Sequence, residues 1–302
     1  MEVVARLLAL LVLLLVGAGL RTTGVLDRRR VAGLNTIAYY VALPALVFVS
    51  TYDQNVADLL SVALVGGLLF VLGTTAALAW VVHRNRGSND RSSVAIVQSY
   101  HSNLGYLGLP LVAATFDARV TAIASVVLGV VTLTQLPMTI VVLSTLNGAD
   151  AALVGEIRGI VKNPVLLALI VGLAVGSAGV SIPSTVASGF DAVAALALPI
   201  ALLCVGASLQ VEASTIDFGA VVSVIALKIC CMPILAWLVF SALGVDPATF
   251  TAAVVMLGTP TAVSTYVFAA ELGGDRKFAS LNVFATTLAS IVTLFVLITL
   301  VS

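Results

Sequence analysis

Charged residues are rare in this sequence. Asp, Glu, Lys and Arg make up 9% of its 302 residues, whereas a soluble domain carries about 25%, and its mean hydropathy is +1.18. A chain of this composition cannot cover itself with a polar surface, so we expect it to lie in a lipid bilayer. The formal net charge is zero and the basic residues form no long runs, which argues against nucleic acid as a partner.

Metal-binding and catalytic patterns are also missing. The three cysteines, Cys204, Cys230 and Cys231, lie in apolar stretches and match no metal-ligand spacing, so we interpret them as small hydrophobic residues. The sequence has no H-E-x-x-H, no G-x-S-x-G and no paired aspartates within its apolar segments, so hydrolysis has no obvious machinery. We expect no catalytic residues, no metal and no cofactor.

Long apolar segments dominate what is present. About 20 apolar residues cross the roughly 30 Å hydrocarbon core as a helix, and charged or turn-rich breaks divide the chain into ten such segments. The first lacks a basic n-region and a convincing cleavage site, so we interpret it as a membrane span rather than a signal peptide. We predict an all-α membrane protein with spans at about 3–20, 36–52, 57–82, 93–116, 118–145, 160–178, 184–210, 217–243, 247–272 and 277–301.

The basic residues favour one orientation. Eleven of the 14 lie in connections that follow odd-numbered spans, whereas Arg6 and Arg119 lie on the opposite side and Lys228 lies within a span. Cytoplasmic connections carry an excess of Lys and Arg, so we expect a multi-pass protein of the plasma membrane with both termini outside. The eleven residues are Arg21, Arg28, Arg29, Arg30, Arg84, Arg86, Arg91, Arg158, Lys162, Arg276 and Lys277.

The two halves of the chain resemble each other. An Ala-Leu-Pro triplet begins at Ala42 and again at Ala197, 155 residues later, and Trp80 and Trp237 are separated by 157 residues. Pro110 in span 4 and Pro260 in span 9 are separated by 150 residues. Five spans per half is an odd number, so the second half would cross the bilayer in the opposite sense. We predict an inverted repeat of two five-helix units, residues 1–150 and 151–302.

Spans 4 and 9 contain residues that interrupt a helix. Freed backbone groups cost several kcal/mol each in lipid, so broken helices persist only where protein or a water-filled cavity surrounds the break. In span 4, Gly105 and Gly108 would let the backbone leave helical geometry, and Pro110 would start a new half-helix.

In span 9, Thr259 would cap a half-helix that starts at Pro260, with Thr261 in its first turn. The positive ends of both half-helices would then attract an anion. The alternative is a pair of proline kinks that serve only packing.

At these residues the sequence resembles the auxin efflux carrier family, the PIN-like transporters and their prokaryotic relatives. The motifs are "SNLGYLGLPL" (Ser102–Leu111), "ALPIALLCVGASL" (Ala197–Leu209) and "GTPTAVSTYVFAAELGGD" (Gly258–Asp275). The resemblance implies a fold related to bile acid/sodium symporters, with discontinuous spans 4 and 9 that cross. It also implies a scaffold domain of spans 1, 2, 6 and 7, a transport domain of spans 3–5 and 8–10, and an elevator-type movement.

The same resemblance implies that Asn103, Pro110 and Pro260 line the substrate site and that the substrate is an organic monoanion. The long hydrophilic loop of the larger plant carriers is missing here, because only about 14 residues join spans 5 and 6. Regulation by phosphorylation of such a loop is therefore not supported, and the substrate need not be auxin.

Lys228 is the one basic residue deep within a span. It lies 11 residues after Asp217, which corresponds to about 16 Å of helix, and a charge at that depth costs about 2.5–3.5 kcal/mol on insertion scales. No acidic residue lies at a comparable depth. Lys228 could bind the substrate or carry a coupling proton, extend to the cytoplasmic surface, or be neutral in the core. It could also donate to carbonyls that a helix break leaves free.

Other polar residues of the spans complete the set of candidates. His101 could carry a proton near physiological pH, or be a hydrogen-bonded packing residue. Gln135 in span 5 and Ser208 in span 7 could face the substrate or join helices by hydrogen bonds. The G-x-x-x-G pattern "GLAVG" at Gly172–Gly176 indicates close packing in the scaffold or a homodimer.

The leading hypothesis is a secondary transporter that exports a small organic anion, with the site at Asn103, Gly105, Gly108, Pro110, Gln135, Ser208, Lys228, Thr259, Pro260 and Thr261. The alternative is a sodium- or proton-coupled symporter or exchanger of the same fold, with His101 or Lys228 as the proton carrier. Sodium sites need several oxygen ligands, usually including a carboxylate, and neither interruption contains Asp or Glu.

Overall fold

The computed structural model describes residues 2–149, 159, 162–208 and 218–301. Helices account for most of these residues, and the only β-pairing within the described ranges is one isolated antiparallel bridge between Ser102 and Thr261. The all-α prediction is therefore confirmed for this part of the chain. The predicted cytoplasmic residue Arg158 and most of the connection between spans 5 and 6 lie outside the described residues.

The first half contains eight α-helices and two π-helical segments, η1 and η2, which carry i to i+5 hydrogen bonds. In chain order these are α1 (Glu2–Thr22), α2 (Arg28–Ile37), η1 (Ala38–Ala42), α3 (Leu43–Thr51), α4 (Val56–Leu59), α5 (Val62–His83), α6 (Asn89–Gln98), η2 (Leu104–Gly108), α7 (Leu109–Thr115) and α8 (Ala118–Asn147).

The described part of the second half contains eight α-helices and one further π-helical segment. In chain order these are α10 (Pro164–Ser177), α11 (Ser184–Ala194), α12 (Ala197–Ser208), α13 (Phe218–Ile225), η3 (Ala226–Cys231), α14 (Met232–Ala242), α15 (Pro247–Leu257), α16 (Ser264–Glu271) and α17 (Arg276–Val301).

Each of the ten predicted segments contains helix, but not every helix is long. Six continuous helical stretches are long and apolar enough to cross a membrane: Arg28–Thr51, Val62–His83, Ala118–Asn147, Ser184–Ser208, Gly219–Ala242 and Arg276–Val301. Shorter apolar helices occupy the segments predicted as spans 4, 6 and 9, and α1 occupies span 1. Spans 4 and 9 contain short helices because each is interrupted internally. Neither of the two helical pieces of such a span has the length of a crossing helix.

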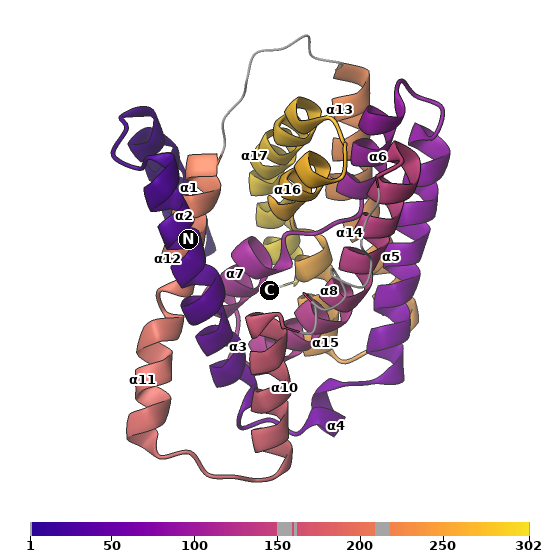
Figure 1. Ribbon diagram of the computed structural model, residues 1–302. Coiled ribbons are helices and arrows are strands. Elements are labelled where there is room, and N and C mark those ends of the chain that lie inside the picture. The colour runs from indigo at the N-terminus through magenta and orange to yellow at the C-terminus, as the bar shows by residue number, and fades with distance from the viewer. Residues whose placement is uncertain (1, 150–158, 160–161, 209–217, 302) are drawn as a thin grey trace.

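The helices form two groups (Figure 1). On one side α1 packs along α12, and α3 packs along α10 and α11. On the other side α5, α6, α8 and α13 to α17 form a larger bundle, in which α15 packs against α8 and α14. The turns that join α1 to α2, α5 to α6 and α16 to α17 lie at the same upper end of the view.

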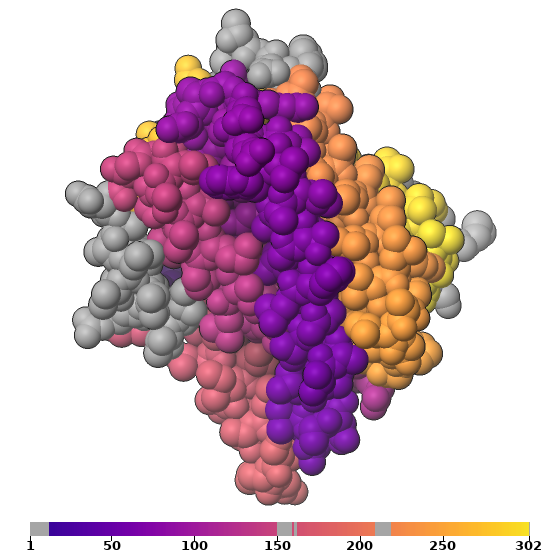
Figure 2. All heavy atoms as spheres, turned by 90° about the vertical axis from the view of Figure 1, so that its right-hand side faces the viewer, coloured from indigo at the N-terminus to yellow at the C-terminus, as the bar shows by residue number. Residues whose placement is uncertain are grey.

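The outer surface of the larger bundle is apolar. Figure 2 shows α5, in purple, as a continuous column that is flanked by the orange residues of α13 and α14. Large hydrophobic side chains on these helices are exposed, among them Phe70 and Val81 of α5 and Ile234 and Leu238 of α14. A surface of this kind suits contact with lipid, as expected from the scarcity of charge.

Glycines bring the helices of the smaller group into close contact. A Cβ atom added to Gly17 of α1 or to Gly206 of α12 would collide with the main chain of the facing helix, at Leu203 and Leu14 respectively. Gly172 of α10 likewise approaches Thr51. A Cβ atom added to Gly172 would lie 3.3 Å from the carbonyl oxygen of Phe48. Small residues allow such close approach between membrane helices.

These contacts recur with a constant offset. Gly17 and Gly172 are 155 residues apart, and so are their partners Phe48 and Leu203. In the α1–α12 contact, the glycine comes from the first half and its partner from the second half. In the α10–α3 contact, the equivalent glycine comes from the second half and the equivalent partner from the first half. The predicted G-x-x-x-G pattern takes part, since Gly172 and Gly176 both pack against the chain around Thr51 to Gln54.

Each π-helical segment precedes a proline. Pro44, Pro110 and Pro233 occupy the second position of α3, α7 and α14, directly after η1, η2 and η3. Proline has no N–H and its ring clashes with the carbonyl four residues earlier in an α-helix. A wider π-helical turn shifts the hydrogen-bond register before the proline, so these helices continue through it.

We predict that Gly206→Ala destabilises the protein by about 1–3 kcal/mol, because the added methyl group has no space between α12 and α1. Gly66→Ala on α5 is the matched control: nothing lies within 4 Å of its added Cβ, and alanine favours helix over glycine by up to about 1 kcal/mol. Thermal unfolding of the purified variants measures both effects. A Gly206→Ala protein as stable as the parent would contradict the close approach.

Candidate functional site

The two predicted interruptions exist, and they meet. The first separates α6, which ends at Gln98, from η2, which begins at Leu104. The second separates α15, which ends at Leu257, from α16, which begins at Ser264. The backbone N–H of Asn103 donates to the carbonyl oxygen of Pro260 at 2.8 Å, and the N–H of Ala262 donates to that of His101 at 3.1 Å. Two short extended strands thus satisfy each other where both helices stop.

Gln135 of α8 holds one of these strands. Its side-chain oxygen accepts from the backbone N–H of Ser102 at 3.0 Å, and its side-chain nitrogen donates to the carbonyl oxygen of Ser102 at 3.2 Å. The amide of Gln135 therefore pairs with Ser102 as a neighbouring strand would. Its side chain is 3% exposed, so these bonds replace the water that the freed backbone groups would otherwise need.

A second buried network fixes the end of α6. The carbonyl oxygen of Gln98 accepts from the hydroxyl of Thr261 in the other interruption. The side-chain nitrogen of Gln98 donates to the Thr265 hydroxyl at 2.9 Å and to the Ala279 carbonyl at 3.0 Å, and its oxygen accepts from Asn282 at 2.8 Å. Gln98 thereby joins α6, α16 and α17.

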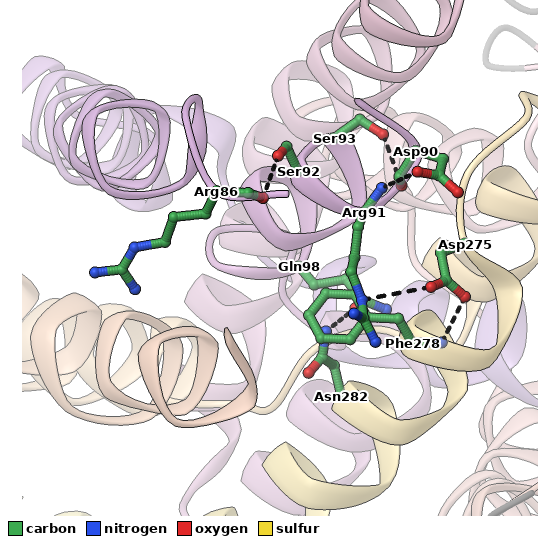
Figure 3. A network of polar contacts seen from close by, with 9 residues as sticks. All are labelled: Arg86, Asp90, Arg91, Ser92, Ser93, Gln98, Asp275, Phe278 and Asn282. Carbon is green, nitrogen blue, oxygen red and sulfur yellow. Dashed lines mark hydrogen bonds and ion pairs between the residues drawn. The ribbon is translucent and has the colours of Figure 1, made fainter. Parts of the chain in front are cut away.

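The same helices are linked at their outer ends, as Figure 3 shows. Arg91 lies 3.5 Å from a carboxylate oxygen of Asp275, and its guanidinium lies 5.0 Å from the ring centre of Phe278. The backbone N–H of Asp275 donates to the carbonyl oxygen of Asp90 at 3.1 Å. The ion pair is partly exposed and stabilises little by itself, but it places the start of α6 beside the start of α17.

The half-helices begin later or earlier than the sequence predicted. The one in span 4 begins at Leu104 rather than at Pro110, which lies inside continuous helix because η2 widens the turn before it. The one in span 9 begins at Ser264 rather than at Pro260. Thr259 is not its cap: the hydroxyl donates backwards to the carbonyl oxygen of Met256 at 2.8 Å. Pro260 could start a helix, but here its carbonyl oxygen accepts the hydrogen bond from the backbone N–H of Asn103.

The two glycines of span 4 do not open the helix either. Both lie within η2 and have helical backbone geometry around them. A Cβ on Gly108 would lie 2.9 Å from the Met256 sulfur and 3.1 Å from a methyl carbon of Thr259. Gly108 is therefore required by the close crossing of the two interrupted segments, and its conformational freedom is not used. Gly105 borders open space, with Leu43 at 3.8 Å from its added Cβ.

A cavity of about 590 Å³ lies next to the crossing. Its wall combines both groups of helices: the smaller group contributes Asn35, Tyr39, Cys204 and Ser208, among others, and the larger group contributes residues of α8, η2, α16 and both interruptions. Of the predicted site residues, the wall includes His101, Asn103, Gly105, Gln135 and Ser208. It does not include Gly108, Pro110, Lys228, Thr259, Pro260 or Thr261, which lie behind it.

Among the described residues of this wall, Asn103 has the one buried side-chain donor that lacks a hydrogen-bond partner. Its side-chain nitrogen is buried and has no hydrogen-bond partner, although its backbone N–H and carbonyl are both used. The residue is 3% exposed. A buried amide without a partner costs about 1–3 kcal/mol, and such exceptions are concentrated at sites that a ligand completes.

The remaining cavity candidates are already paired. The His101 Nδ1 atom lies 2.8 Å from the Thr139 hydroxyl, and the Ser208 hydroxyl donates to the carbonyl oxygen of Cys204 at 2.8 Å within its own helix. Both residues still border the cavity. Their hydroxyl and ring atoms can therefore meet a bound molecule, but neither has an unsatisfied group that requires one.

Lys228 neither lines the cavity nor reaches a surface. Its side chain is 0% exposed, which rules out extension to the cytoplasmic side. The Nζ atom donates to the carbonyl oxygen of Leu257 at 2.9 Å, the last residue of α15, and lies 3.3 Å from the Met232 sulfur. Of the roles that the sequence left open for Lys228, these contacts match donation to a carbonyl that a helix break leaves free.

Sequence reasoning missed part of the wall. Asn35, Tyr39, Tyr106 and Asn163 border the cavity, and the Tyr106 hydroxyl donates to the carbonyl oxygen of Asn35 at 3.4 Å. Polar and aromatic residues within apolar segments were the available signal. They come from four separate helical elements, however, and only the packed structure brings these to one space.

Comparison with known proteins identifies the family of this chain. A family model described as "Membrane transport protein" matches residues 2–156 and 151–298. The chain belongs to this family. The resemblance to the auxin efflux carrier family and the assignment as a membrane transporter are thereby confirmed.

Relatives within the family are distant but nearly full-length. An "Uncharacterized transporter" of Methanothermobacter thermautotrophicus is 25% identical over 292 residues, which cover 95% of this chain and 94% of the relative. A protein of Rhizobium meliloti named "Putative malonate transporter" is 24% identical over 272 residues, covering 86% of this chain and 83% of the relative. A second "Uncharacterized transporter", of Methanocaldococcus jannaschii, is 25% identical, with 94% of both chains covered.

We predict that Gln135→Leu lowers the stability of this transporter by about 2–4 kcal/mol, because it leaves the buried N–H and carbonyl of Ser102 without partners. Thr132→Val is the matched control, since it removes a polar group from the same helix and the same cavity wall. The thermal unfolding midpoint in detergent measures both. An equal effect of the two changes would show that Gln135 does not support the interruption.

Proposed function

We propose that the protein is a secondary transporter that exports a small organic anion by alternating access, with the amide of Asn103 as a direct ligand. The observation that carries this proposal is the unpaired side-chain nitrogen of Asn103, buried in the wall of the cavity beside the crossing. A carboxylate oxygen accepts hydrogen bonds only. It would therefore complete the Asn103 amide and remove its desolvation cost.

The cavity supports a small, largely apolar substrate. Its volume of about 590 Å³ falls in the range of small-molecule sites, which are mostly apolar with a few well-placed polar groups. Tyr39, Tyr106 and Leu128 supply apolar surface, and Thr132 and Ser208 supply hydroxyl groups. The malonate in the name of the Rhizobium meliloti relative is a further reason to include carboxylates, short and long, among the substrates tested.

We also propose an inverted repeat of residues 1–150 and 151–302, with ten membrane spans and both termini outside the plasma membrane. The equivalent glycine contacts at an offset of 155 residues support the repeat. Within it, the smaller group of helices would be the scaffold (spans 1, 2, 6 and 7) and the larger bundle the transport domain (spans 3–5 and 8–10). A homodimer would form through the scaffold helices.

An elevator-type movement suits this division. Gln98 and Gln135 bind both interruptions to the larger bundle, whereas Asn35, Tyr39 and Ser208 of the smaller group face them across the cavity. A displacement of one group relative to the other would carry Asn103 and a bound anion with the bundle. The scaffold wall would remain behind, and the cavity would be exposed to the opposite side.

The second candidate is a proton- or sodium-coupled symporter or exchanger of the same fold. His101 favours the proton-coupled form, since its ring borders the cavity and contacts Thr139. Lys228, the other predicted proton carrier, lies behind the wall. Among the described residues no Asp or Glu borders the cavity, so a sodium ion would have only neutral oxygen ligands. Dependence of transport on a sodium or proton gradient would decide for this candidate.

We predict that Asn103→Ala weakens carboxylate binding about tenfold or more, because a hydrogen bond to a charged group contributes about 1.5–3 kcal/mol. The folded protein should lose little stability, since the deleted nitrogen has no partner in the structure. Asn103→Asp should weaken binding further through charge repulsion. Thermal-shift titrations with phenylacetate and malonate measure this. Unchanged affinity in Asn103→Ala would remove the residue from the site.

We predict that purified protein in liposomes moves a monocarboxylate outward faster when the inside is negative. Exit of one negative charge then gains about 2.3 kcal/mol per 100 mV, and export needs no coupled ion. Radiolabelled efflux under potassium diffusion potentials of both signs, with protein-free liposomes as the control, measures this. Flux that ignores the voltage but follows an imposed pH or sodium gradient would favour the coupled candidate.

A further inference from the structure

Lys228 is a buried amine without a carboxylate partner among the described residues. It lies in η3, is fully enclosed, and contacts the Leu257 carbonyl oxygen at 2.9 Å and the Met232 sulfur at 3.3 Å. No carboxylate forms an ion pair with it among the residues that the structure describes. Burying an ammonium group in this way is costly, so its position calls for a compensating role.

Part of that role is structural. In an uninterrupted helix the carbonyl oxygen of Leu257 would accept from the N–H of residue 261, but α15 ends at Leu257 and the chain leaves the helix after its C-cap, Gly258. Lys228 supplies the missing donor. At the equivalent end of α6, the carbonyl oxygen of Gln98 accepts from the neutral hydroxyl of Thr261 instead. With the 157-residue spacing of the two tryptophans, the position of the first half that is equivalent to Lys228 is Val71. A lysine is therefore present in one half of the repeat only.

The crossing would otherwise be nearly neutral. Each interruption joins the end of one helix to the start of the next, and a helix carries about half a negative charge at its end and half a positive charge at its start. These partial charges cancel within each interruption, so the helix starts alone do not make the centre positive. In its protonated form, the amine of Lys228 adds a full positive charge that the helix ends do not cancel.

This charge lies one side chain behind the cavity. The Met232 sulfur that contacts Lys228 also accepts from the hydroxyl of Ser102 at 3.8 Å, and Ser102 borders the cavity. A unit charge about 10 Å from an ion, at an effective dielectric constant of about 20, changes the local concentration of that ion roughly tenfold. The low dielectric of the buried wall preserves such an effect against screening by salt.

We propose that Lys228 is a positioning residue with two linked effects: it holds the open end of α15, and it makes the cavity selective for anions without contacting them. This inference deepens the proposed function by assigning the source of anion preference. It concerns the potential of the cavity, which can be measured without knowing the substrate.

The test uses a cysteine in the cavity wall. Ser264 borders the cavity and is exposed, so Ser264→Cys is introduced together with Cys204→Ala, Cys230→Ala and Cys231→Ala. Negatively charged sulfonatoethyl methanethiosulfonate and positively charged trimethylammonioethyl methanethiosulfonate then modify the thiol at measurable rates. The rate of the negatively charged reagent is divided by the rate of the positively charged one. This ratio, divided by the same ratio for a free thiol in solution, reports the local potential.

We expect this normalised ratio to exceed one in the parent protein and to fall about a hundredfold in Lys228→Met, because losing the charge changes each of the two rates about tenfold in opposite directions. Methionine keeps the volume and removes the charge. Lys228→Arg should retain the ratio within about twofold. Lys162→Met, at an exposed lysine, is the matched control and should change nothing. Where Lys228→Met yields no folded protein, Lys228→Gln, which keeps a donor for Leu257, carries the same comparison.

A parent ratio of one or below, or an unchanged ratio in a folded variant that lacks the charge, overturns the proposal. Failure of the proposed function is a separate result: the protein would show the charge-dependent labelling and yet move no carboxylate in liposomes. A purely structural role for Lys228 would lower the unfolding temperature of Lys228→Met and Lys228→Gln and leave the labelling ratio in place.

Discussion

The structure depends on one constraint: backbone groups that leave a helix inside a membrane must find partners in the protein. Two helices stop halfway through the bundle, and each stop frees several N–H and carbonyl groups. The two interruptions satisfy part of this demand for each other through the Ser102–Thr261 bridge. Side chains satisfy other freed groups: Gln135 of α8 pairs with Ser102, Thr261 of the second interruption with Gln98, and Lys228 of η3 with Leu257.

This solution also forms the cavity. Because extended strands replace helix at the crossing, side chains of the interruptions lie beside open space rather than on the surface of a continuous cylinder. Among the described residues of the cavity wall, the one buried side-chain polar atom without a partner is the nitrogen of Asn103. A network that is otherwise satisfied makes an unpaired donor informative, since leaving it dry is costly. In the proposed function, recognition of the substrate is concentrated on Asn103, whose backbone is fixed by the pairing around it.

Much of the fold could be predicted because lipid leaves few alternatives. The apolar segments read as spans all contain helix, and the prolines and small residues of spans 4 and 9 correctly marked the interrupted ones. Asn103, which was predicted to line the substrate site, lies at the crossing and borders the cavity. The predictions of where the half-helices begin were wrong. Pro110 was expected to start a helix and instead follows a π-helical turn, and Thr259 was expected to cap a helix and instead bonds back to Met256.

Composition and periodicity by themselves determined the environment of the chain, the helical class and the two places where helices must break, because these follow from the cost of polar groups in hydrocarbon. Tertiary structure alone decided which groups satisfy the breaks. Gln135 and Lys228 are 33 and 29 residues from Ser102 and Leu257 along the chain, and nothing local to either residue specifies its partner. Only the packing of α8 and η3 against the crossing makes Gln135 a substitute strand and Lys228 a substitute backbone donor.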